Sequence, residues 1–144
     1  FIKSECINID PSEASTHIFG YAVGVDLTKR DLQSAAKEAS KPWDLSKGFD
    51  NSAPISKIIK KEGFLFDEGR ISLNVNGQNR QLSNILNMIW KVDELISWLS
   101  KFITLKAGDI IFTGTPAGVG RLVPKDKIDA EIENVGTLSF ELTK

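Results

Sequence analysis

The sequence predicts an α+β domain that is rich in β-structure and has flanking helices, on three observations. Apolar and polar residues alternate over 71–75, and Asn76-Gly77 then supplies a dipeptide that favours a tight hairpin turn into 78–82. A second alternation covers 128–132 and 138–142, which predicts an antiparallel pair of strands near the C-terminus. Only two segments of the chain show helical spacing. The strands therefore outnumber the helices in the predicted fold.

The two helices are predicted from apolar residues at helical spacing. The first covers Lys29 to Ala39, with Thr28 placed to cap its N-terminus and Pro42 placed to stop it. The second covers Met88 to Ile103 and should place an apolar face on a sheet. The apolar residues that define this second helix are Val92, Leu95, Ile96, Leu99 and Phe102.

Two short apolar runs predict buried strands that lead into polar segments. Tyr21 to Val25 ends at Asp26, and Asp109 to Phe112 leads into the glycine-rich stretch Thr113 to Gly120. The segment from Trp43 to Ile55 is expected to be an ordered loop with a short strand near its end, because it combines Gly, Pro and small polar residues. Ordered loops often hold functional side chains.

Composition limits the domain count and the partners. The chain has 144 residues and 41% hydrophobic content, enough for one packed domain over residues 1–144 and too little for two. Lys and Arg total 18 against 19 for Asp and Glu, and neither sign forms a block, so neither a nucleic-acid surface nor a polybasic membrane patch is expected. The longest apolar stretches fall far short of the roughly 20 residues that span a bilayer. We therefore expect a small molecule or a second copy of the chain as partner.

Cys6 is the only cysteine, which excludes an internal disulfide and a cysteine-built zinc site. A single cysteine fits a reducing compartment, so the expected location is the cytoplasm, or the mitochondrion in a eukaryote. We expect Cys6 to pack as a small apolar residue. The first residue is Phe1, and Phe1 to Cys6 has no feature of a signal peptide, so the chain is expected to be N-terminally incomplete.

Candidate functional residues follow the first predicted strand. Asp26 stands at the strand's end, where a carboxylate can bind a hard cation, although a turn or helix-capping role fits the local pattern as well. Arg30 and Gln33 lie three residues apart on the first helix, so both can project from one side and bind a carboxylate or an oxygen. A solvated helix face is the alternative reading of that pair.

The other candidates lie in loops. Lys47 could act as a point charge beside a developing anion, although most lysines are simply on the surface. Thr113 to Gly120 has three glycines and two threonines, which allow close backbone approach and donation to an anionic oxygen, or only a structural turn. It lacks the Gly-Lys-Ser/Thr ending of a phosphate-binding loop. His17 is the only histidine, and no nucleophile motif accompanies it, so we leave it out of the site.

Taken together, four motifs resemble the fumarylacetoacetate hydrolase family. The resemblance runs in order from about residue 18 to the C-terminus and is closest to the branch of acylpyruvate hydrolases and oxaloacetate decarboxylases or tautomerases. The motifs are Gly20 to Gln33, Pro42-Trp43 to Asp50, Val75 to Gln78 with Arg80-Gln81, and Thr104-Leu105 with Gly108 to Gly120.

The resemblance implies a fold, a cofactor and a set of roles. The fold would be a mixed β-roll with flanking helices, commonly as a homodimer. A Mg²⁺ or Mn²⁺ ion would be held by a Glu-x-Glu pair and by Asp26. Arg30, Gln33 and Thr115 would bind the substrate, and Lys47 would be the active-site lysine.

The resemblance has two gaps. The family's Glu-x-Glu pair should precede Gly20 by roughly two dozen residues, but Phe1 to Phe19 contains only Glu5 and Glu13, which are not so paired. The family's His and Glu acid-base dyad is absent as well. The 144 residues alone are therefore expected to be inactive, as part of a complete enzyme. A catalytically inactive homologue with a structural or interaction role is the alternative.

The expected substrate is a small 2-oxo acid. Its carboxylate and 2-oxo oxygens would bind the metal, and the ion and Lys47 would stabilise the enolate that develops. Acylpyruvate C–C bond hydrolysis, oxaloacetate decarboxylation and oxaloacetate tautomerisation all pass through an enolate. The residues present therefore indicate the electrophilic half of the site more firmly than they indicate the product.

Overall fold

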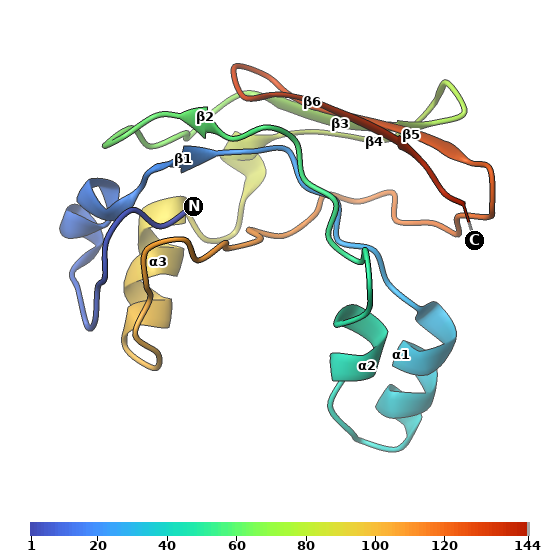
Figure 1. The fold of residues 1–144 in the computed structure, drawn as a ribbon, viewed down its shortest axis with the longest axis horizontal. Helices are drawn as coiled ribbons and strands as arrows, with labels where there is room; N and C mark the ends of the chain where they lie inside the picture. The colour runs from blue at the N-terminus through green and yellow to red at the C-terminus, as the bar shows by residue number, and fades with distance from the viewer. Residues whose placement is uncertain (144) are drawn as a thin grey trace.

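The largest element of the fold is a four-stranded sheet with the order β4-β3-β5-β6, in which every neighbouring pair is antiparallel. The computed structural model describes residues 1–143, and Figure 1 shows the sheet as one layer. The α+β, β-rich class is confirmed, as are the predicted hairpin and the C-terminal pair. The strands are β3 (Arg70–Val75), β4 (Gln78–Asn84), β5 (Lys127–Ile132) and β6 (Gly136–Glu141).

The hairpin between β3 and β4 turns at Asn76 and Gly77, whose φ angles are 52° and 76°. Two central residues with positive φ are what a two-residue hairpin turn requires, because its twist then matches that of the strands. The pairing shifts register between Leu73 and Asn74: Leu73 faces Gln81, and Asn74 faces Asn79. Arg80 is therefore the extra residue of a β-bulge in β4.

A second, two-stranded sheet pairs β1 (Gly20–Tyr21) with β2 (Ile59–Lys60). Beyond it the two chains stay together as a ribbon, defined here as residues 23–27 and 52–56. The ribbon contains a bridge between Gly24 and Ile55 and backbone bonds from Val25 N to the Pro54 oxygen (3.0 Å) and from Leu27 N to the Ser52 oxygen (2.9 Å). The predicted strand at 21–25 is thus partly right, and the short strand expected near Ile55 corresponds to this single bridge.

The ribbon leads to two helices that lie together away from the four-stranded sheet (Figure 1). They are α1 (Arg30–Glu38) and α2 (Asp44–Lys47), and we call residues 29–48 the helical arm. Helix α1 ends before Pro42, as predicted, with Ser40 at φ 50°. The expected cap at Thr28 is wrong, because the N-cap is Lys29 and it makes no side-chain capping bond. Helix α2 was missed, since one turn is too short to show periodicity.

Helix α3 (Val92–Ser100) is shorter than the predicted Met88 to Ile103. It starts after Lys91, whose backbone N–H donates to Glu94 Oε2 at 2.8 Å and so marks the N-terminus. Ile96 of α3 packs in the first core cluster, which otherwise comes from the N-terminal segment and Leu105 and includes the buried Cys6, as expected. No helix within residues 1–143 is long and apolar enough to cross a membrane. Two short 3₁₀ helices complete the elements, η1 (Pro11–His17) and η2 (Ile85–Asn87).

The buried strand predicted at Asp109 to Phe112 is wrong. These residues belong to no strand, and the side chains of Ile110 and Phe112 are exposed. Asp109 instead closes a turn, because its Oδ2 accepts from the Lys106 backbone N–H at 2.7 Å. A run of apolar residues indicates a strand only where a neighbouring chain can bond to it. Here the N-terminal segment pairs with residues up to 109, through Ile2 N to the Asp109 oxygen at 2.9 Å, and the chain then continues as coil.

A second core cluster joins the ribbon to the four-stranded sheet. Its buried members are Val23 of the ribbon, Phe66, Ala130 of β5 and Val135. Because this cluster fixes Val23, it also fixes the start of the ribbon relative to the sheet.

Candidate functional site

The predicted residues Asp26 and Lys47 meet directly. Lys47 Nζ lies 2.7 Å from Asp26 Oδ2 and 2.8 Å from Thr28 Oγ1, so the ammonium group bridges two oxygens of the chain between the ribbon and α1. The side chains of Lys47 and Asp26 are 36% and 49% exposed. The pair is therefore ordered by short bonds and still open to a ligand from solvent.

Lys47 lies 21 residues after Asp26 and 19 residues after Thr28, and backbone hydrogen bonds explain how its side chain reaches them. The Lys29 N–H donates to the Ser46 oxygen at 3.0 Å, which fixes α2 against the start of α1. Ser46 is buried, and its hydroxyl donates to the Trp43 oxygen at 2.6 Å, which closes the single turn of α2. The last residue of that turn is Lys47, and its side chain extends to Asp26.

Arg30 and Gln33 form a second pair on α1. Arg30 Nη1 donates to Gln33 Oε1 at 2.8 Å, and Gln33 is buried whereas Arg30 is exposed. The two side chains therefore lie on one side of the helix, as their spacing indicates. The Gln33 amide oxygen accepts one N–H of the Arg30 guanidinium, and the other N–H groups of Arg30 remain able to bind an anion.

Thr115 lies in the glycine-rich part of the fourth motif, which runs as coil between two contacts. At one end the Phe112 ring packs on Gly24, where an added Cβ would lie 2.7 Å from the ring. At the other end Gly118, with φ 102°, lies so close to the Arg80 carbonyl that any Cβ would collide with it. The stretch that contains Thr115 is therefore fixed at two places. One is Gly24, two residues before Asp26, and the other is the β4 bulge at Arg80.

Within that stretch, the Thr115 hydroxyl is bonded to Gln81 and not to the ion pair. Gln81 Nε2 lies 2.9 Å from Thr115 Oγ1 and 2.9 Å from the Pro116 oxygen. No hydrogen bond within residues 1–143 joins Thr115 to Asp26 or Lys47. Gln81, which is buried in β4, belongs to one of the four family motifs, but the sequence assigned it no role, because a glutamine in an alternating strand does not by itself indicate one.

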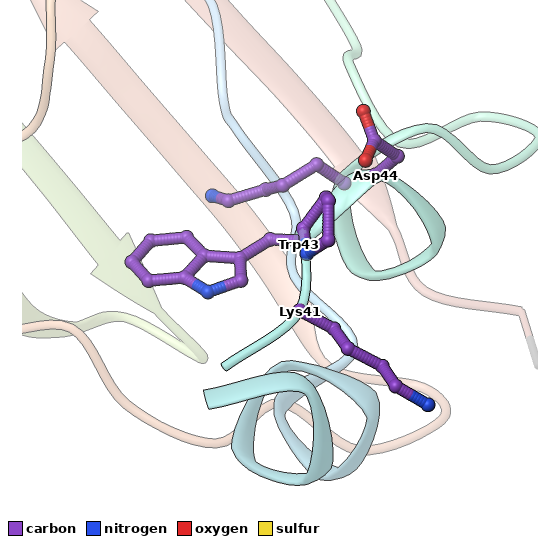
Figure 2. Close-up of a pocket in the computed structure, with 5 residues that line it drawn as sticks. Lys41, Trp43 and Asp44 are labelled. Atoms are coloured by element: carbon purple, nitrogen blue, oxygen red, sulfur yellow. The ribbon is translucent and has the colours of Figure 1, made fainter. Parts of the chain in front are cut away.

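An open hollow of about 430 Å³ lies beside Lys47. Figure 2 shows the lining side chains, with those of Lys41 and Asp44 directed away from the Trp43 indole. Helix α1 also contacts Trp43, because Lys37 Nζ lies over the indole ring at 4.8 Å from its centroid. The hollow thus shares Lys47 with the ion pair. Its lining residues are Lys41, Pro42, Trp43, Asp44 and Lys47.

The fit to a divalent cation can be tested on the donors present. Mg²⁺ and Mn²⁺ prefer oxygen ligands in octahedral sets, and Asp26 offers one half-exposed carboxylate with one oxygen bonded to Lys47. Across residues 1–143 there is no group of three or more His, Cys, Asp or Glu side chains that could hold a metal ion. Asp26 therefore suits the role of one ligand and does not complete a site.

His17 lies apart from these groups, at the end of η1. Its Nδ1 is 3.0 Å from Ser4 Oγ and 3.2 Å from the Ser4 carbonyl oxygen, so the ring links η1 to the N-terminal segment. The one cysteine is also structural, since Cys6 is buried and burial raises the pKa of its thiol. Neither residue is close to the ribbon or the helical arm in sequence or in the contacts described.

Comparison with known proteins identifies the family. The model of the fumarylacetoacetate (FAA) hydrolase C-terminal family matches residues 1–143, and the chain belongs to this family. The family expected from the four motifs is therefore confirmed.

Among its relatives, the chain is 41% identical over 132 residues to fumarylpyruvate hydrolase of Ralstonia sp, covering 92% of this chain and 69% of that protein. It is 48% identical over 113 residues to oxaloacetate tautomerase YcgM of Escherichia coli, covering 77% of this chain and 52% of that protein. These names belong to the branch that the sequence indicated.

A solved structure gives the same result. The crystal structure of fumarylpyruvate hydrolase from Pseudomonas aeruginosa in complex with Mn²⁺ and pyruvate aligns with a TM-score of 0.95 and 40% sequence identity. The alignment covers 99% of this chain and 61% of that one. The chain thus spans between 52% and 69% of the length of these three relatives.

Proposed function

We propose that this chain supplies the metal-binding and substrate-binding part of a divalent-metal-dependent enzyme that acts on small 2-oxo acids. The observation that supports it most directly is the contact of Lys47 Nζ with Asp26 Oδ2 at 2.7 Å. Asp26 belongs to the ribbon, in which Gly24 packs against Phe112, the residue that precedes the glycine-rich stretch. Relatives of 41% and 48% identity are named fumarylpyruvate hydrolase and oxaloacetate tautomerase, and both names refer to enzymes that act on 2-oxo acids.

In this proposal Asp26 is a ligand of Mg²⁺ or Mn²⁺, and the other ligands come from residues outside these 144. The P. aeruginosa relative, 40% identical, was crystallised with Mn²⁺ and pyruvate, which supports both the kind of cation and the kind of ligand. A bound divalent cation would act as a Lewis acid that stabilises negative charge on a substrate oxygen. Within residues 1–143, Asp26 is the carboxylate that we propose for such an ion, and no group of three or more His, Cys, Asp or Glu side chains is present to complete the site.

Lys47 is proposed as the catalytic residue. Its ammonium group is a compact positive charge with three N–H donors, of which one donates to Asp26 and one to Thr28. A third N–H remains for a substrate oxygen on which negative charge increases as an enolate develops. Because Thr28 and Asp26 already fix the group, no reorganisation is needed when that charge appears.

Arg30, Gln33 and Thr115 are proposed to bind the substrate. The Arg30 guanidinium would bind a carboxylate, held at one corner by Gln33, and the Thr115 hydroxyl would donate to a second oxygen. The hollow beside Lys47, lined by Trp43, would take the part of the substrate that distinguishes one 2-oxo acid from another. We propose acylpyruvate C–C bond hydrolysis or oxaloacetate decarboxylation or tautomerisation as the reaction.

The experiment is a turnover assay on the full-length protein that contains this chain. The protein is stripped of metal with a chelator and assayed with fumarylpyruvate, other acylpyruvates and oxaloacetate, before and after Mn²⁺ or Mg²⁺ is added. We expect turnover of at least one of these acids, lost on stripping and restored by either ion. Turnover that survives stripping, or no turnover with any 2-oxo acid, would contradict the proposal and favour an inactive homologue.

We also propose that residues 1–144 form one catalytic domain of a homodimer. The exposed aromatic side chains on α3 and just before and after it support a contact surface there: the Trp98 ring centroid lies 4.7 Å from that of Phe102 and 6.4 Å from that of Trp90. Sedimentation of the full-length protein should give twice the monomer mass. A monomer at micromolar concentration would overturn this part of the proposal.

A further inference from the structure

Gln81 is buried in β4 next to the bulge at Arg80. A bulge adds one residue to a strand and so changes which face the following side chain takes. Here Gln81 is buried while its neighbours Arg80 and Leu82 are exposed. The bulge therefore directs one polar side chain of the sheet toward the stretch that contains Thr115.

The contacts of Gln81 fix the direction of its amide. The Pro116 carbonyl oxygen can only accept, so the atom that faces it at 2.9 Å must be the donor Nε2 and not the carbonyl oxygen of the side chain. The same Nε2 lies 2.9 Å from Thr115 Oγ1, and an amide nitrogen has no lone pair to accept with. The Thr115 oxygen is therefore the acceptor in this bond.

This leaves the hydroxyl proton of Thr115 with no part in the bond to Gln81. A threonine hydroxyl has one proton and two lone pairs, and Gln81 uses one of the lone pairs. The proton must then point away from Gln81. A donor that is already accepting a hydrogen bond is also polarised, which strengthens the bond it donates.

We propose that Gln81 is a positioning residue that makes the Thr115 hydroxyl a donor to an anionic oxygen of the substrate. This rests on the proposed function, in which Thr115 binds the substrate. Gln81 itself contacts no substrate in this account. It acts through the two bonds to Thr115 and Pro116, which set both the place and the direction of the hydroxyl.

The rest of the stretch has supports of its own, so that loss of Gln81 should act locally. Gly118 packs on the Arg80 backbone, and Phe112 packs on Gly24. Further on, Asp126 accepts from the Val123 N–H at 2.8 Å. The Gly118 contact also includes Gln81 Cγ, which a Cβ at Gly118 would meet at 3.3 Å, and Gln81→Met keeps this carbon, so all three contacts should survive that replacement.

The test is a double-mutant cycle on the full-length protein loaded with Mn²⁺, with pyruvate as the probe. The variants are Gln81→Met, which keeps the length of the side chain and removes the amide, Thr115→Val, which removes the hydroxyl, and the double variant. Calorimetry measures the pyruvate dissociation constant, and circular dichroism measures the unfolding temperature. Gln78→Met is the matched control, because Gln78 lies on the same strand and is exposed.

We expect each single variant to weaken pyruvate binding about tenfold, since a hydrogen bond to a charged group is lost or misdirected. The double variant should be no weaker than Thr115→Val, because Gln81 acts only through that hydroxyl. Gln78→Met should bind pyruvate as the wild type does. An effect of Gln81→Met that is equal in both backgrounds, or no effect at all, would overturn the inference.

The cycle also separates this inference from the proposed function. If the wild type binds pyruvate but turns over no 2-oxo acid, the proposed function fails while the cycle still decides the role of Gln81. If Thr115→Val binds pyruvate normally, the role of Thr115 and the inference fail together, and the roles of Asp26 and Lys47 stand. If the wild type does not bind pyruvate at millimolar concentration, both the function and the inference are overturned.

Discussion

The four-stranded sheet and the helical arm are held together in different ways. The sheet buries apolar side chains such as Ile128 and Ala130 and has continuous ladders of backbone bonds. On the arm the buried side chains are polar, Gln33 in α1 and Ser46 in α2, while Leu45 is 79% exposed. The arm is therefore fixed by the ribbon and by a few specific polar bonds.

The difference indicates that most of the stability and most of the predicted site residues belong to different regions of the chain. Four of the five predicted site residues lie on the arm or on the ribbon just before it, and the fifth, Thr115, is bonded to the sheet through Gln81. Apolar burial gives most of the free energy of folding, so the sheet should account for most of the stability. Arg30 and Lys47 on the arm remain accessible to ligand because their side chains are not part of a core. Substitutions in the two regions should therefore change different measured quantities.

The largest change in stability is expected in the sheet. Ile128 is fully buried, and Ile128→Ala should lower the free energy of unfolding by roughly 2–5 kcal/mol, through lost burial and the cavity left behind. The matched change on the arm, Leu45→Ala, should stay within about 0.5 kcal/mol because that side chain is already in solvent. Urea unfolding of the full-length protein measures both. Equal losses in the two variants would mean that the arm has a core of its own.

The largest change in activity is expected on the arm. Lys47→Met should raise the barrier by about 3 kcal/mol, roughly a hundredfold in kcat, because a donor to developing charge is lost. Stability should change by about 1 kcal/mol or less, since both members of the pair with Asp26 are more than a third exposed. Steady-state kinetics and urea unfolding of the same preparation check the two halves. Near-normal turnover would remove Lys47 from the proposed mechanism.

A smaller effect on activity is expected from Arg30→Lys. Lysine keeps the charge but cannot give the two-point grip on a carboxylate, so KM should rise about tenfold while kcat changes little. The bond from Arg30 Nη1 to Gln33 Oε1 at 2.8 Å would also be lost or lengthened. Steady-state kinetics with the substrate found in the turnover assay measures this. A fall in kcat at constant KM would assign Arg30 to the chemical step instead.

The smallest effect is expected far from both regions, at Glu62. Hydrogen bonds from Lys3 and then Lys60, at 2.8 and 2.9 Å, lower the pKa of Glu62 from 4.5 to about 2. A carboxyl whose pKa is lower in the folded state contributes stability above its unfolded pKa, and that contribution is lost as pH falls from about 4.5 toward 2. Glu62→Gln should therefore have a slightly lower unfolding temperature at pH 6, and the gap to the wild type should narrow as pH falls from about 4.5 toward 2. A gap that widens on acidification would contradict this.

The regular parts of the fold could be predicted from the sequence because their signals are local. Period-two alternation and the Asn76-Gly77 dipeptide fix the hairpin and its face, and Pro42 marks the end of the first helix. The strand predicted at 109–112 failed because a strand depends on a partner, and the partner for residues up to 109 turned out to be the N-terminal segment. Pairing with a distant segment leaves no trace in the apolar pattern itself.

The site was predictable in part for the same reason. Asp26 and Lys47 were named from motifs, and the structure joins them at 2.7 Å, but neither α2 nor the bond to Thr28 could be read from the pattern. Gln81 stands in one of the family motifs, but its contact with Thr115 could not be predicted, because that contact depends on a bulge and on a coil some 35 residues further along the chain. A role that arises from packing between distant segments becomes visible only in the three-dimensional structure.

The central claim is that Asp26 binds the metal while Lys47 acts on the substrate, and a Mn²⁺ titration of two variants tests it most directly. In the full-length protein, Asp26→Asn should raise the Mn²⁺ dissociation constant on the order of tenfold or more, because a neutral amide replaces a carboxylate ligand. Lys47→Met should bind Mn²⁺ as tightly as the wild type or slightly more tightly, since an ammonium competes with a cation for Asp26 Oδ2. Unchanged Mn²⁺ affinity in Asp26→Asn, or lost affinity in Lys47→Met, would contradict the account.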